Sequence, residues 1–316
     1  MSLSTALVLS RHDGTMPSES SREMITAGDL LADQVVVATF DTPPAEQFAA
    51  FGATEILACD TAELGDINVE DAGVWAALAV AAARQVNPDV IILGSTHLGK
   101  EIAAQIGMIL DSGVVTDADG VSVEDGRLSI EKAVFSGTWA TRPTVIRGIP
   151  VVALRPTAIK AREREAQAVP VSPLSIEVPE RSKRTRLVQR QRHGGGGAAL
   201  SEAQVVVCGG RGMDGDFTLA YQLAEKLGGV VGATRVACDE GWIDHSVQIG
   251  QTGETVAPTL YIGLGVSGAI HHTTGMAASQ HIAVICDDED APIFGLADIG
   301  VVGDLNTIVP ELLELL

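Results

Sequence analysis

A glycine-rich turn that leads into two adjacent histidines holds residue types that could do chemistry. Residues 263–276 read GLGVSGAIHHTTGM, and Gly263, Gly265 and Gly268 fit the spacing G-x-G-x-x-G. The run before them is apolar and suits a strand, so Ser267 and Gly268 could open a helix whose backbone N–H groups face a phosphate. A metal site or a catalytic pair are the other chemical interpretations of the same stretch.

Two further features narrow the chemistry of this turn. A dinucleotide site needs an acidic residue about twenty positions on to hold a ribose, and Asp287 and Asp288 close the next strand as required. His271 and His272 are neighbours on a helix, about 100° apart around its axis, so they do not easily ligate one metal ion. The pattern favours a dinucleotide without separating NAD from FAD. A tight turn that binds nothing, with structural or surface histidines, stays open as the alternative.

Two arginines and a second glycine turn could complete such a site. Arg211 and Arg235 each follow a strand within a loop of small residues, where a guanidinium can grip a phosphate or lie over an aromatic ring system. A surface ion pair is the alternative role for each. Residues 250–253 (GQTG) offer an amide and a hydroxyl between two glycines. The chain has no G-x-S-x-G sequence and no prominent pair of carboxylates, so this part is better equipped to hold a cofactor than to transform a substrate.

The elements that must position these loops fall into two sets. At 316 residues the chain is long enough for two domains. Over the first 160 residues, short apolar runs alternate with helical ones. We expect strands at 6–10, 35–40, 55–58 and 89–94, with helices at 73–86 and from about 97 to 110. Further strands around 127–130, 133–135, 144–147 and 151–154 predict a doubly wound sheet with an antiparallel extension.

A second α/β set follows in the C-terminal part. We expect strands at 204–208, 230–232, 259–262 and 282–286, and helices at 217–227, after the glycine turn, and at 305–316. The loops after these strands carry the glycine, arginine, threonine and serine residues. This organisation is typical of nucleotide-binding domains, in which ligands lie at the carboxyl ends of the strands.

A basic and glycine-rich segment separates the two sets. Six cations precede four consecutive glycines at 194–197, namely Arg181, Lys183, Arg184, Arg186, Arg190 and Arg192. Four glycines in a row hold neither helix nor strand, so we interpret 179–200 as a linker between domains at 1–178 and 201–316. A nucleic-acid arm is the alternative. On so acidic a chain we expect a solvated segment, or one that docks on an acidic neighbour.

The charge balance argues against nucleic acid as a partner. The chain has 41 acidic and 21 basic residues, a net charge of −20. Such a surface repels nucleic acid and stays soluble where salt screens self-repulsion, which predicts a salt-loving source. Full stability in dilute buffer would contradict that prediction.

Cysteine and hydropathy patterns limit the remaining classes. The four cysteines are far apart without a C-x-x-C, so we expect buried reduced thiols and no zinc or iron–sulfur site: Cys59, Cys208, Cys238 and Cys286. No apolar run approaches the roughly 18 residues of a membrane span, and the N-terminal apolar stretch is too short for a signal peptide. We therefore expect a soluble, cytoplasmic protein.

Six motifs in one register resemble the alpha subunit of electron transfer flavoprotein, a FixB-like family. They are GGRG at 209–212, VGATR at 231–235, GQTG at 250–253, LYIGLGVSGAIHHTTGM at 260–276, APIF at 291–294 and ADIGVVGDL at 297–305. The first domain fits through VNPDVIILGSTHLGKEIAAQIG at 86–107. The resemblance implies two domains, each a mostly parallel doubly wound sheet, the first adenine-nucleotide-hydrolase-like and the second Rossmann-like and FAD-binding.

The resemblance also implies an electron carrier rather than an enzyme. Such a protein binds FAD, pairs with a beta subunit in a heterodimer, takes electrons from dehydrogenases such as acyl-CoA dehydrogenases, and passes them to a membrane quinone oxidoreductase. The beta subunit usually carries AMP, and a second FAD there would allow electron bifurcation. An FAD- or NAD-dependent dehydrogenase subunit is the alternative from the glycine spacing alone.

Carried over position by position, the resemblance implies FAD contacts from Arg211, Thr234, Arg235, Ile249, Gly250, Gln251, Thr252, Ser267, Gly268, Ala269, Ile270, His271, His272, Cys286, Asp304 and Leu305. Arg235 would lie against the isoalloxazine and stabilise the negative charge of the reduced flavin. Thr252 would offer its hydroxyl near N5, and His272 would lie near the pyrimidine edge. The turn from Ser267 and Arg211 would serve the phosphates, while Asp304 and Leu305 would lie by the adenosine end.

Three positions depart from the family pattern. Thr234 stands where serine is usual, which keeps the hydroxyl and adds a methyl group. His271 stands where glutamine is usual. Cys286 and Asp287 replace asparagine and lysine, so an amide is missing and a charge is reversed. These changes affect the expected adenosine contacts more than those of the isoalloxazine.

Overall fold

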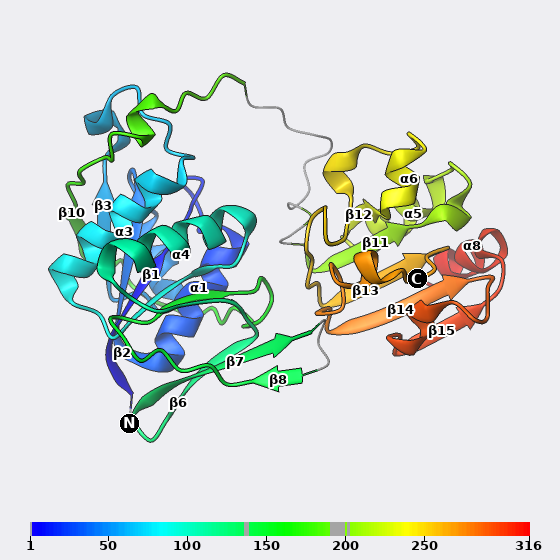
Figure 1. Ribbon diagram of the computed structural model, residues 1–316, viewed down its shortest axis with the longest axis horizontal. Helices are drawn as coiled ribbons and strands as arrows, with labels where there is room; N and C mark the ends of the chain where they lie inside the picture. The colour runs from blue at the N-terminus through cyan, green and yellow to red at the C-terminus, as the bar shows by residue number, and fades with distance from the viewer. Residues whose placement is uncertain (1, 136–138, 190–199, 201–202) are drawn as a thin grey trace. The chain divides into compact units, whose positions relative to one another are not determined.

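The computed structural model describes residues 2–135, 139–189, 200 and 203–316, and these residues form two compact units. The first unit holds β1 to β10 and the second holds β11 to β15 (Figure 1). The fold class expected from the sequence is confirmed, since each unit is an α/β unit built on a parallel sheet. Residues 190–199 of the expected linker, with Arg190, Arg192 and the four glycines, lie outside the described residues.

A seven-stranded parallel sheet forms the centre of the first unit, in the order β10-β3-β2-β1-β4-β9-β5. Its strands are β1 (Leu3–Leu9), β2 (Ala32–Phe40), β3 (Glu55–Cys59), β4 (Val90–Gly94), β5 (Val114–Ala118), β9 (Val151–Leu154) and β10 (Val171–Pro173). The chain leaves β1 toward β2 on one side, whereas β4 lies on the other. The topological switch point of this sheet therefore falls between β1 and β4.

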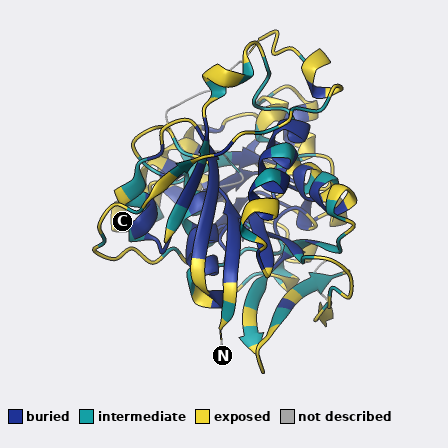
Figure 2. Ribbon diagram, turned by 90° about the vertical axis from the view of Figure 1, so that its left-hand side faces the viewer, coloured by how far each residue is buried: buried dark blue, intermediate teal, exposed yellow. Residues whose placement is uncertain are grey.

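Helices cover both faces of this sheet, which explains the continuous apolar runs of its strands. They are α1 (Glu19–Leu31), α2 (Ala45–Ala50), α3 (Ala72–Val86) and α4 (His97–Leu110). Side chains alternate along β1, so that Leu7 packs with α3 and α4 whereas Val8 packs with α1 and α2. Figure 2 shows the central strands buried along most of their length and the helices exposed on their outer faces.

The region between β5 and β9 differs from the sequence-based expectation in four ways. A separate antiparallel sheet is formed there by β6 (Gly120–Glu124), β7 (Arg127–Val134) and β8 (Trp139–Thr141). The two strands expected at 127–130 and 133–135 are the single strand β7, and 144–147 is not a strand. Pro143 and Pro150 flank that segment and donate no hydrogen bonds to a ladder. The fourth expected strand, β9, pairs parallel with β4 and β5 and so belongs to the main sheet.

A five-stranded parallel sheet forms the second unit, in the order β12-β11-β13-β14-β15. Its strands are β11 (Val205–Gly209), β12 (Val230–Ala233), β13 (Leu260–Leu264), β14 (His281–Cys286) and β15 (Ile299–Val302). Its helices are α5 (Thr218–Lys226), α6 (Arg235–Asp239), α7 (Ile270–Thr273) and α8 (Leu305–Leu315). This is the strand order 2-1-3-4-5 of a doubly wound sheet, whose switch point falls between its first and third strands, β11 and β13.

The core of the second unit again has two layers. On one face, α5, α6 and α8 pack on residues such as Val207 and Leu264. On the other face, loop residues such as Ile249, Met276 and Ile293 cover the sheet in place of helices. Loop residues thus reach the carboxyl ends of β11 and β13, where the candidate site lies.

The beginning of the expected linker packs onto the first unit. Ser182, in a short 3-10 turn (Ser182–Arg184), is fully buried, and its hydroxyl donates to Asp71 Oδ1 over 2.6 Å. Asp71 is the N-cap of α3 and also accepts from the backbone N–H of Gly73. Burial raises the pKa of Asp71, but the hydrogen bonds from Ser182 and Thr185 outweigh it and leave that pKa below its ordinary value. The contact is made by the hydroxyl of Ser182, and Arg181 adds an ion pair with Glu101 at 4.0 Å.

The four cysteines are all buried and none forms a disulfide. Burial raises the pKa of Cys208 to about 12, so its thiol is inert near neutral pH. No helix among the described residues combines the length and the apolar character that crossing a membrane requires.

Candidate functional site

A cavity of about 570 Å³ opens at the carboxyl ends of β11, β12, β13 and β14, within the second unit. Four loops line it, one after each strand, together with the segment 248–252. The lining residues are Arg211, Gly212, Asp214, Thr234, Arg235, Val236, Gln248, Ile249, Gly250, Thr252, Gly265, Val266, Ser267, Gly268, Ala269, His271, His272, Cys286, Asp287 and Asp288. The volume falls within the range of cofactor pockets, and the position is the switch point of the sheet.

Two glycine loops meet backbone to backbone at the floor of this cavity. Gly212 N donates to Gly265 O over 3.1 Å, and Gly210 N donates to Leu264 O over 2.9 Å. A Cβ atom on Gly265 would lie 2.7 Å from the Cα of Gly212, and one on Gly210 would lie 2.2 Å from Gly265 O. These glycines are therefore required so that two loops of the protein can touch.

Gly268 has a similar structural requirement that the sequence did not suggest. Its φ is +85°, and a Cβ atom there would lie 2.4 Å from the backbone nitrogen of Ile293. The approach expected from a pyrophosphate is thus made by the protein's own chain at this position. A side chain at Gly268 would displace the loop itself, whatever ligand the loop binds.

Three consecutive residues of the turn after β13 line the cavity with backbone N–H groups that have no acceptor within the described part of the chain. They are Ser267, Gly268 and Ala269. The helix expected to open here is α7, which has only four residues, so its dipole adds little. Successive unpaired amides of a turn still form an anion-binding concavity, and this is the arrangement that a phosphate requires.

Two cations and three carboxylates set the charge of the lining. Arg235 is in an exposed ion pair with Asp239, with Nε 3.2 Å from Oδ2, whereas Arg211 forms no ion pair with a described residue. The carboxylates belong to Asp214, Asp287 and Asp288. Arg211 is therefore the cation that can pair with an incoming anion without first leaving a partner.

The segment that carries Thr252 is tied to the histidine turn. Gln251 N donates to His271 O over 2.7 Å, and His271 Nδ1 lies 2.7 Å from Gln251 Oε1. Gly250 allows the close approach, because a Cβ atom there would lie 2.7 Å from His271 O. His271 thus links the histidine turn to the GQTG turn by two hydrogen bonds.

His272 lies in the lining but directs both ring nitrogens into the protein. Nδ1 is 3.0 Å from the carbonyl oxygen of Ile249, which only accepts, so Nδ1 carries the proton. Nε2 is 2.7 Å from the hydroxyl of Tyr261, and burial raises the pKa of that tyrosine well above its ordinary value, so the hydroxyl donates to Nε2. Burial lowers the pKa of His272, partly offset by the bond to Ile249, which keeps the imidazole neutral.

The structure gathers twelve of the sixteen residues expected to contact a cofactor. The other four lie outside the lining. Gln251 and Ile270 are exposed beside it, Asp304 caps α8 by accepting from Asn306 N, and Leu305 packs in the core with α5. The adenosine contacts expected of the last two stay predictions.

One lining residue that the sequence analysis missed is Gln248. It is only 7% exposed, and it lies between the apolar Val247 and Ile249. A lone amide in an apolar run beside the GQTG turn is the signal that could have found it. Asp287 and Asp288, expected to hold a ribose, do line the cavity.

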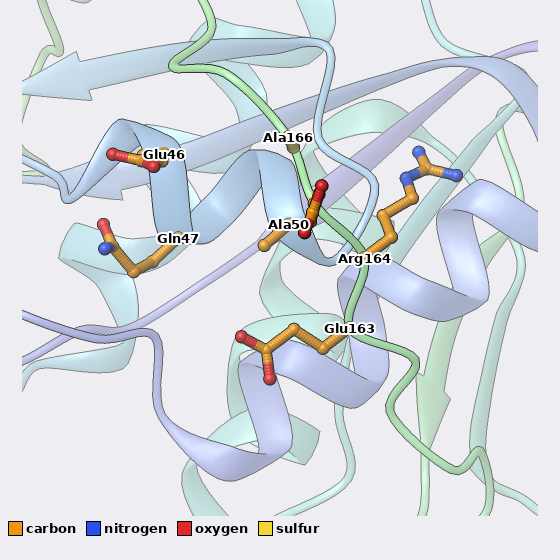
Figure 3. A pocket seen from close by; sticks show the side chains of 7 residues that line it. Glu46, Gln47, Ala50, Glu163, Arg164 and Ala166 are labelled. Carbon is orange, nitrogen blue, oxygen red and sulfur yellow. The ribbon is translucent and has the colours of Figure 1, made fainter.

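A second hollow, of about 610 Å³, lies on the first unit beside α2 (Figure 3). Its lining includes three carboxylates, from Glu46, Glu163 and Glu165. The one cation there, Arg164, already forms two hydrogen bonds with Asp29, over 3.1 and 2.8 Å. This hollow therefore offers nothing to hold a phosphate. Over the described residues, no cluster of three or more metal-ligating side chains occurs either.

Comparison with known proteins agrees with the site. Residues 6–178 match the electron transfer flavoprotein domain, and residues 199–277 match the electron transfer flavoprotein FAD-binding domain. The chain belongs to the electron transfer flavoprotein alpha-subunit family. It is 38% identical to the electron transfer flavoprotein subunit alpha of Bacillus subtilis over 274 residues, which cover 85% of this chain and 82% of the relative.

Other relatives extend over nearly the whole chain. The electron transfer flavoprotein subunit alpha of Mycobacterium leprae is 36% identical over 321 aligned positions, covering 99% of this chain and 98% of the relative. Protein FixB of Clostridium saccharobutylicum is 31% identical over 273 residues, covering 85% and 81%. FAD is accordingly the cofactor of this chain, as expected from the sequence.

The residues of the electron transfer flavoprotein cavity fit FAD. Three amides and Arg211 supply the donors that a pyrophosphate needs, and Arg235 and Thr252 supply a cation and a hydroxyl for a polar ring system. The cavity is open because several of its lining residues are glycines, which have no side chain to fill it. The donor set therefore matches both the charged and the aromatic part of the cofactor.

Proposed function

We propose that this chain is the FAD-holding alpha subunit of a heterodimer, completed by an electron transfer flavoprotein beta subunit. It carries electrons in the cytoplasm from dehydrogenases, such as the acyl-CoA dehydrogenases of fatty-acid oxidation, to a membrane quinone oxidoreductase. Its relatives are named electron transfer flavoprotein subunit alpha, which supports an electron-carrying role. The observation that supports the proposal most is the cavity with its three amides and two arginines at the switch point of the second sheet.

FAD, when bound, supplies reversible electron transfer in one- and two-electron steps. Arg211 and the amides of Ser267, Gly268 and Ala269 bind the phosphates, because they line the cavity and donate to no described residue. Arg235 places a positive charge beside the ring system and so favours added negative charge there. Its pairing with Asp239 holds the guanidinium at the rim.

The two histidines of the turn act as supports in this proposal. His272 has both nitrogens bonded within the protein, so it fixes the position of Ile249 and the pyrimidine side of the cavity. Thr252 offers its hydroxyl to flavin N5. Asp304, Leu305 and Cys286 serve the adenosine end, with Asp287 or Asp288 accepting from the ribose.

The experiment that tests the proposal is purification of the chain with its beta subunit, followed by stepwise reduction under a visible spectrum. We expect a bound flavin that is bleached by reduction with an electron-donating dehydrogenase and recovers with a quinone reductase. A complex without a flavin band would refute the proposal. Counting flavins per heterodimer separates a simple carrier, with one FAD, from a bifurcating protein, with two.

Replacing Arg235 by alanine tests the role of its charge. We expect Arg235→Ala to retain FAD but to lower its potential by about 20–40 mV, because an exposed charge contributes less than about 1 kcal/mol. Arg235→Lys keeps the charge and should recover most of the shift. Equal potentials in the wild type and in Arg235→Ala, measured by redox titration, would remove Arg235 from the ring site.

A flavin or nicotinamide dehydrogenase is the competing function. It requires an acid or base at the cavity. His272 is held neutral with both nitrogens bonded, so this role would fall to another lining group, such as one of the three carboxylates. Turnover of a small hydroxy or amino substrate by the purified chain alone would favour this alternative over electron carriage.

A further inference from the structure

Polar side chains connect the rim of the cavity to the protein surface in one chain of contacts. Gln248 Nε2 lies 3.0 Å from Thr252 Oγ1, and Gln248 Oε1 lies 3.0 Å from His245 Nδ1. His245 Nε2 is 3.7 Å from one oxygen of Asp239, whose other oxygen is 3.2 Å from Arg235 Nε. The chain thus begins and ends on two residues of the cavity lining and passes through an imidazole whose side chain is 62% exposed.

Gln248 is held so that only its amide group can change direction. Its backbone N–H donates to His245 O over 3.1 Å, and its carbonyl oxygen accepts from Glu254 N over 2.7 Å. Its side chain is buried, so both ends of the amide need partners. His245 and Thr252 are those partners, and each of them can donate or accept.

Two arrangements satisfy this chain, and they differ at the cavity. In the first, His245 Nδ1–H donates to Gln248 Oε1 and the amide donates to Thr252 Oγ1. The Thr252 hydroxyl then has its own proton left to donate into the cavity. In the second, the amide is turned over, so that it donates to an unprotonated Nδ1 and accepts from the Thr252 hydroxyl. Thr252 then offers only lone pairs to a ligand.

Protonation of His245 removes the second arrangement, because a charged imidazole carries a proton on both nitrogens and accepts at neither. We propose that His245 and Gln248 are positioning residues that set the direction of the Thr252 hydroxyl, and that a proton on His245 holds this hydroxyl as a donor toward the cavity. The inference rests on the proposed function, in which Thr252 faces flavin N5. His245 touches no cavity atom and acts through Gln248.

Among the groups around His245, Gln248 is the one that also contacts the Thr252 hydroxyl. From α6 it is faced by Asp239, and the Cys238 thiol of the same helix is bonded to the Asp244 carbonyl, with its pKa raised to about 11 by burial. On its own segment, the Asp244 carboxylate caps the 3-10 turn by accepting from Ser246 N. Strand β12, which packs on this turn, has no titratable side chain.

A matched control for His245 lies in the same unit. His281 is 69% exposed on β14, with Nδ1 3.9 Å from Asp298, so it too is a surface histidine beside a carboxylate. It does not line the cavity. Any general effect of titrating a surface histidine should therefore be seen equally at His281.

The test measures FAD affinity of the heterodimer at pH 5.5 and pH 8, which span the titration range of histidine side chains. Oxidised N5 accepts a hydrogen bond, so the Thr252 donor should strengthen binding at the lower pH by about threefold to tenfold, the equivalent of one hydrogen bond. His245→Asn should lose this pH-dependent factor, and His281→Asn should keep it. We call the path from His245 through Gln248 to the Thr252 hydroxyl the relay. A His245→Asn protein with the wild-type pH profile of FAD affinity would overturn it.

Two further variants show whether the effect passes through Thr252. In Thr252→Val, adding His245→Asn should change the pH profile no further, whereas Thr252→Ser should restore the dependence. Full sensitivity to His245→Asn in the Thr252→Val background would refute transmission through the hydroxyl.

A measurement on the wild type needs no variant. Because coupling is reciprocal, FAD should move the midpoint of the His245 imidazole ¹⁵N titration upward by the same factor. An unmoved midpoint with FAD bound would overturn the relay alone, whereas a heterodimer that binds no FAD would overturn the proposed function instead.

Discussion

The two sheets of this protein have related doubly wound layouts, yet the polar groups at their carboxyl edges behave differently. In the first unit these groups bind one another. Ser95 and Lys100 both contact Asp117, over 3.1 and 2.8 Å, and Arg155 pairs with Asp119 over 3.2 Å. In the second unit, Arg211 and three consecutive amides have no such partner within the described residues, and a cavity lies between the loops.

The space available to a ligand at the two edges also depends on which groups already occupy it. At the end of β4, a Cβ atom on Gly94 would lie 2.5 Å from Ser20 Oγ, so a side chain of α1 already occupies the switch point. At the end of β13, the atoms nearest to a Cβ on Gly265 would be backbone atoms of Gly212 in the other glycine loop, and no side chain is among them. The difference teaches that a doubly wound sheet provides the position of a site, while the side chains at its edge decide whether that site is open to a ligand.

The largest expected effect comes from Gly265→Ala, which separates the two glycine loops. The new methyl group would lie 2.7 Å from Gly212 Cα at a φ of +61°. We expect a loss of about 2–4 kcal/mol in the free energy of unfolding of the second unit, from overpacking and backbone strain together, with loss of FAD. Urea unfolding followed by Trp242 fluorescence measures the first quantity, and flavin content measures the second.

Gly228→Ala is the matched control for this change. Gly228 has nearly the same φ, +66°, but a Cβ atom there would meet no atom within 4 Å beyond its chain neighbours. It should lose only about 1 kcal/mol and keep FAD. Equal losses in the two variants would mean that strain at a positive φ, and not contact between the loops, accounts for the glycine.

A smaller effect is expected when the edge cations are neutralised in turn. Arg211→Gln should weaken FAD binding by about tenfold to a hundredfold, because a charge-assisted hydrogen bond contributes about 1.5–3 kcal/mol, and should leave unfolding unchanged. Arg155→Gln should do the opposite, since its partner is Asp119 of the same unit: FAD affinity should stay and the first unit should lose about 1 kcal/mol.

Flavin titration and urea unfolding of both arginine variants check this pair. The comparison between the edges fails if Arg155→Gln releases FAD, or if Arg211→Gln destabilises the second unit as much as it weakens binding. Lysine at either position would show how much of each effect needs the forked guanidinium and how much needs only the charge.

Much of the fold could be predicted because buried parallel strands are continuous apolar runs. The expected ends of strands such as β4 and β13 lie within two residues of the observed ends. Helix α1 was missed because its buried face includes Ser20, Ser21 and Glu23, which weakens the apolar period. The edge strand β15 was missed as well, since all four of its residues are exposed and pack against little.

Most residues of the site could be predicted from the sequence, but the atoms that each of them contacts could not. Loop glycines and arginines are visible in the sequence, but a sequence does not show which backbone atoms a glycine must admit. Gly268 thus faces Ile293, and His272 faces Tyr261 eleven residues earlier on a strand. Such contacts depend on how separate loops pack, so the partner of each group could be known only from the structure.

The smallest effect expected is a difference between the units in mild acid. Burial lowers the pKa of His272, whose neutral form the folded state needs. Burial raises the pKa of Asp117, but the hydrogen bond and charge of Lys100 outweigh it and leave that pKa below the ordinary 3.8. Both groups stabilise the fold above the pKa of the unfolded chain and lose that contribution as pH falls through the folded value.

The pH windows of the two groups therefore differ, because unfolded histidine begins to bind protons near pH 6.5 whereas unfolded aspartate does so near 3.9. Between pH 7.5 and 5.5 the urea midpoint of the second unit should fall by roughly 0.3 M while that of the first, through Asp117, stays unchanged. Single-tryptophan variants that keep Trp242 or Trp75 report the units separately. His272→Gln should abolish the decrease. If the urea midpoint reported by Trp75 falls equally, acid acts on the whole chain through its surface charge. The two sheet edges would then not differ in how their units respond to pH.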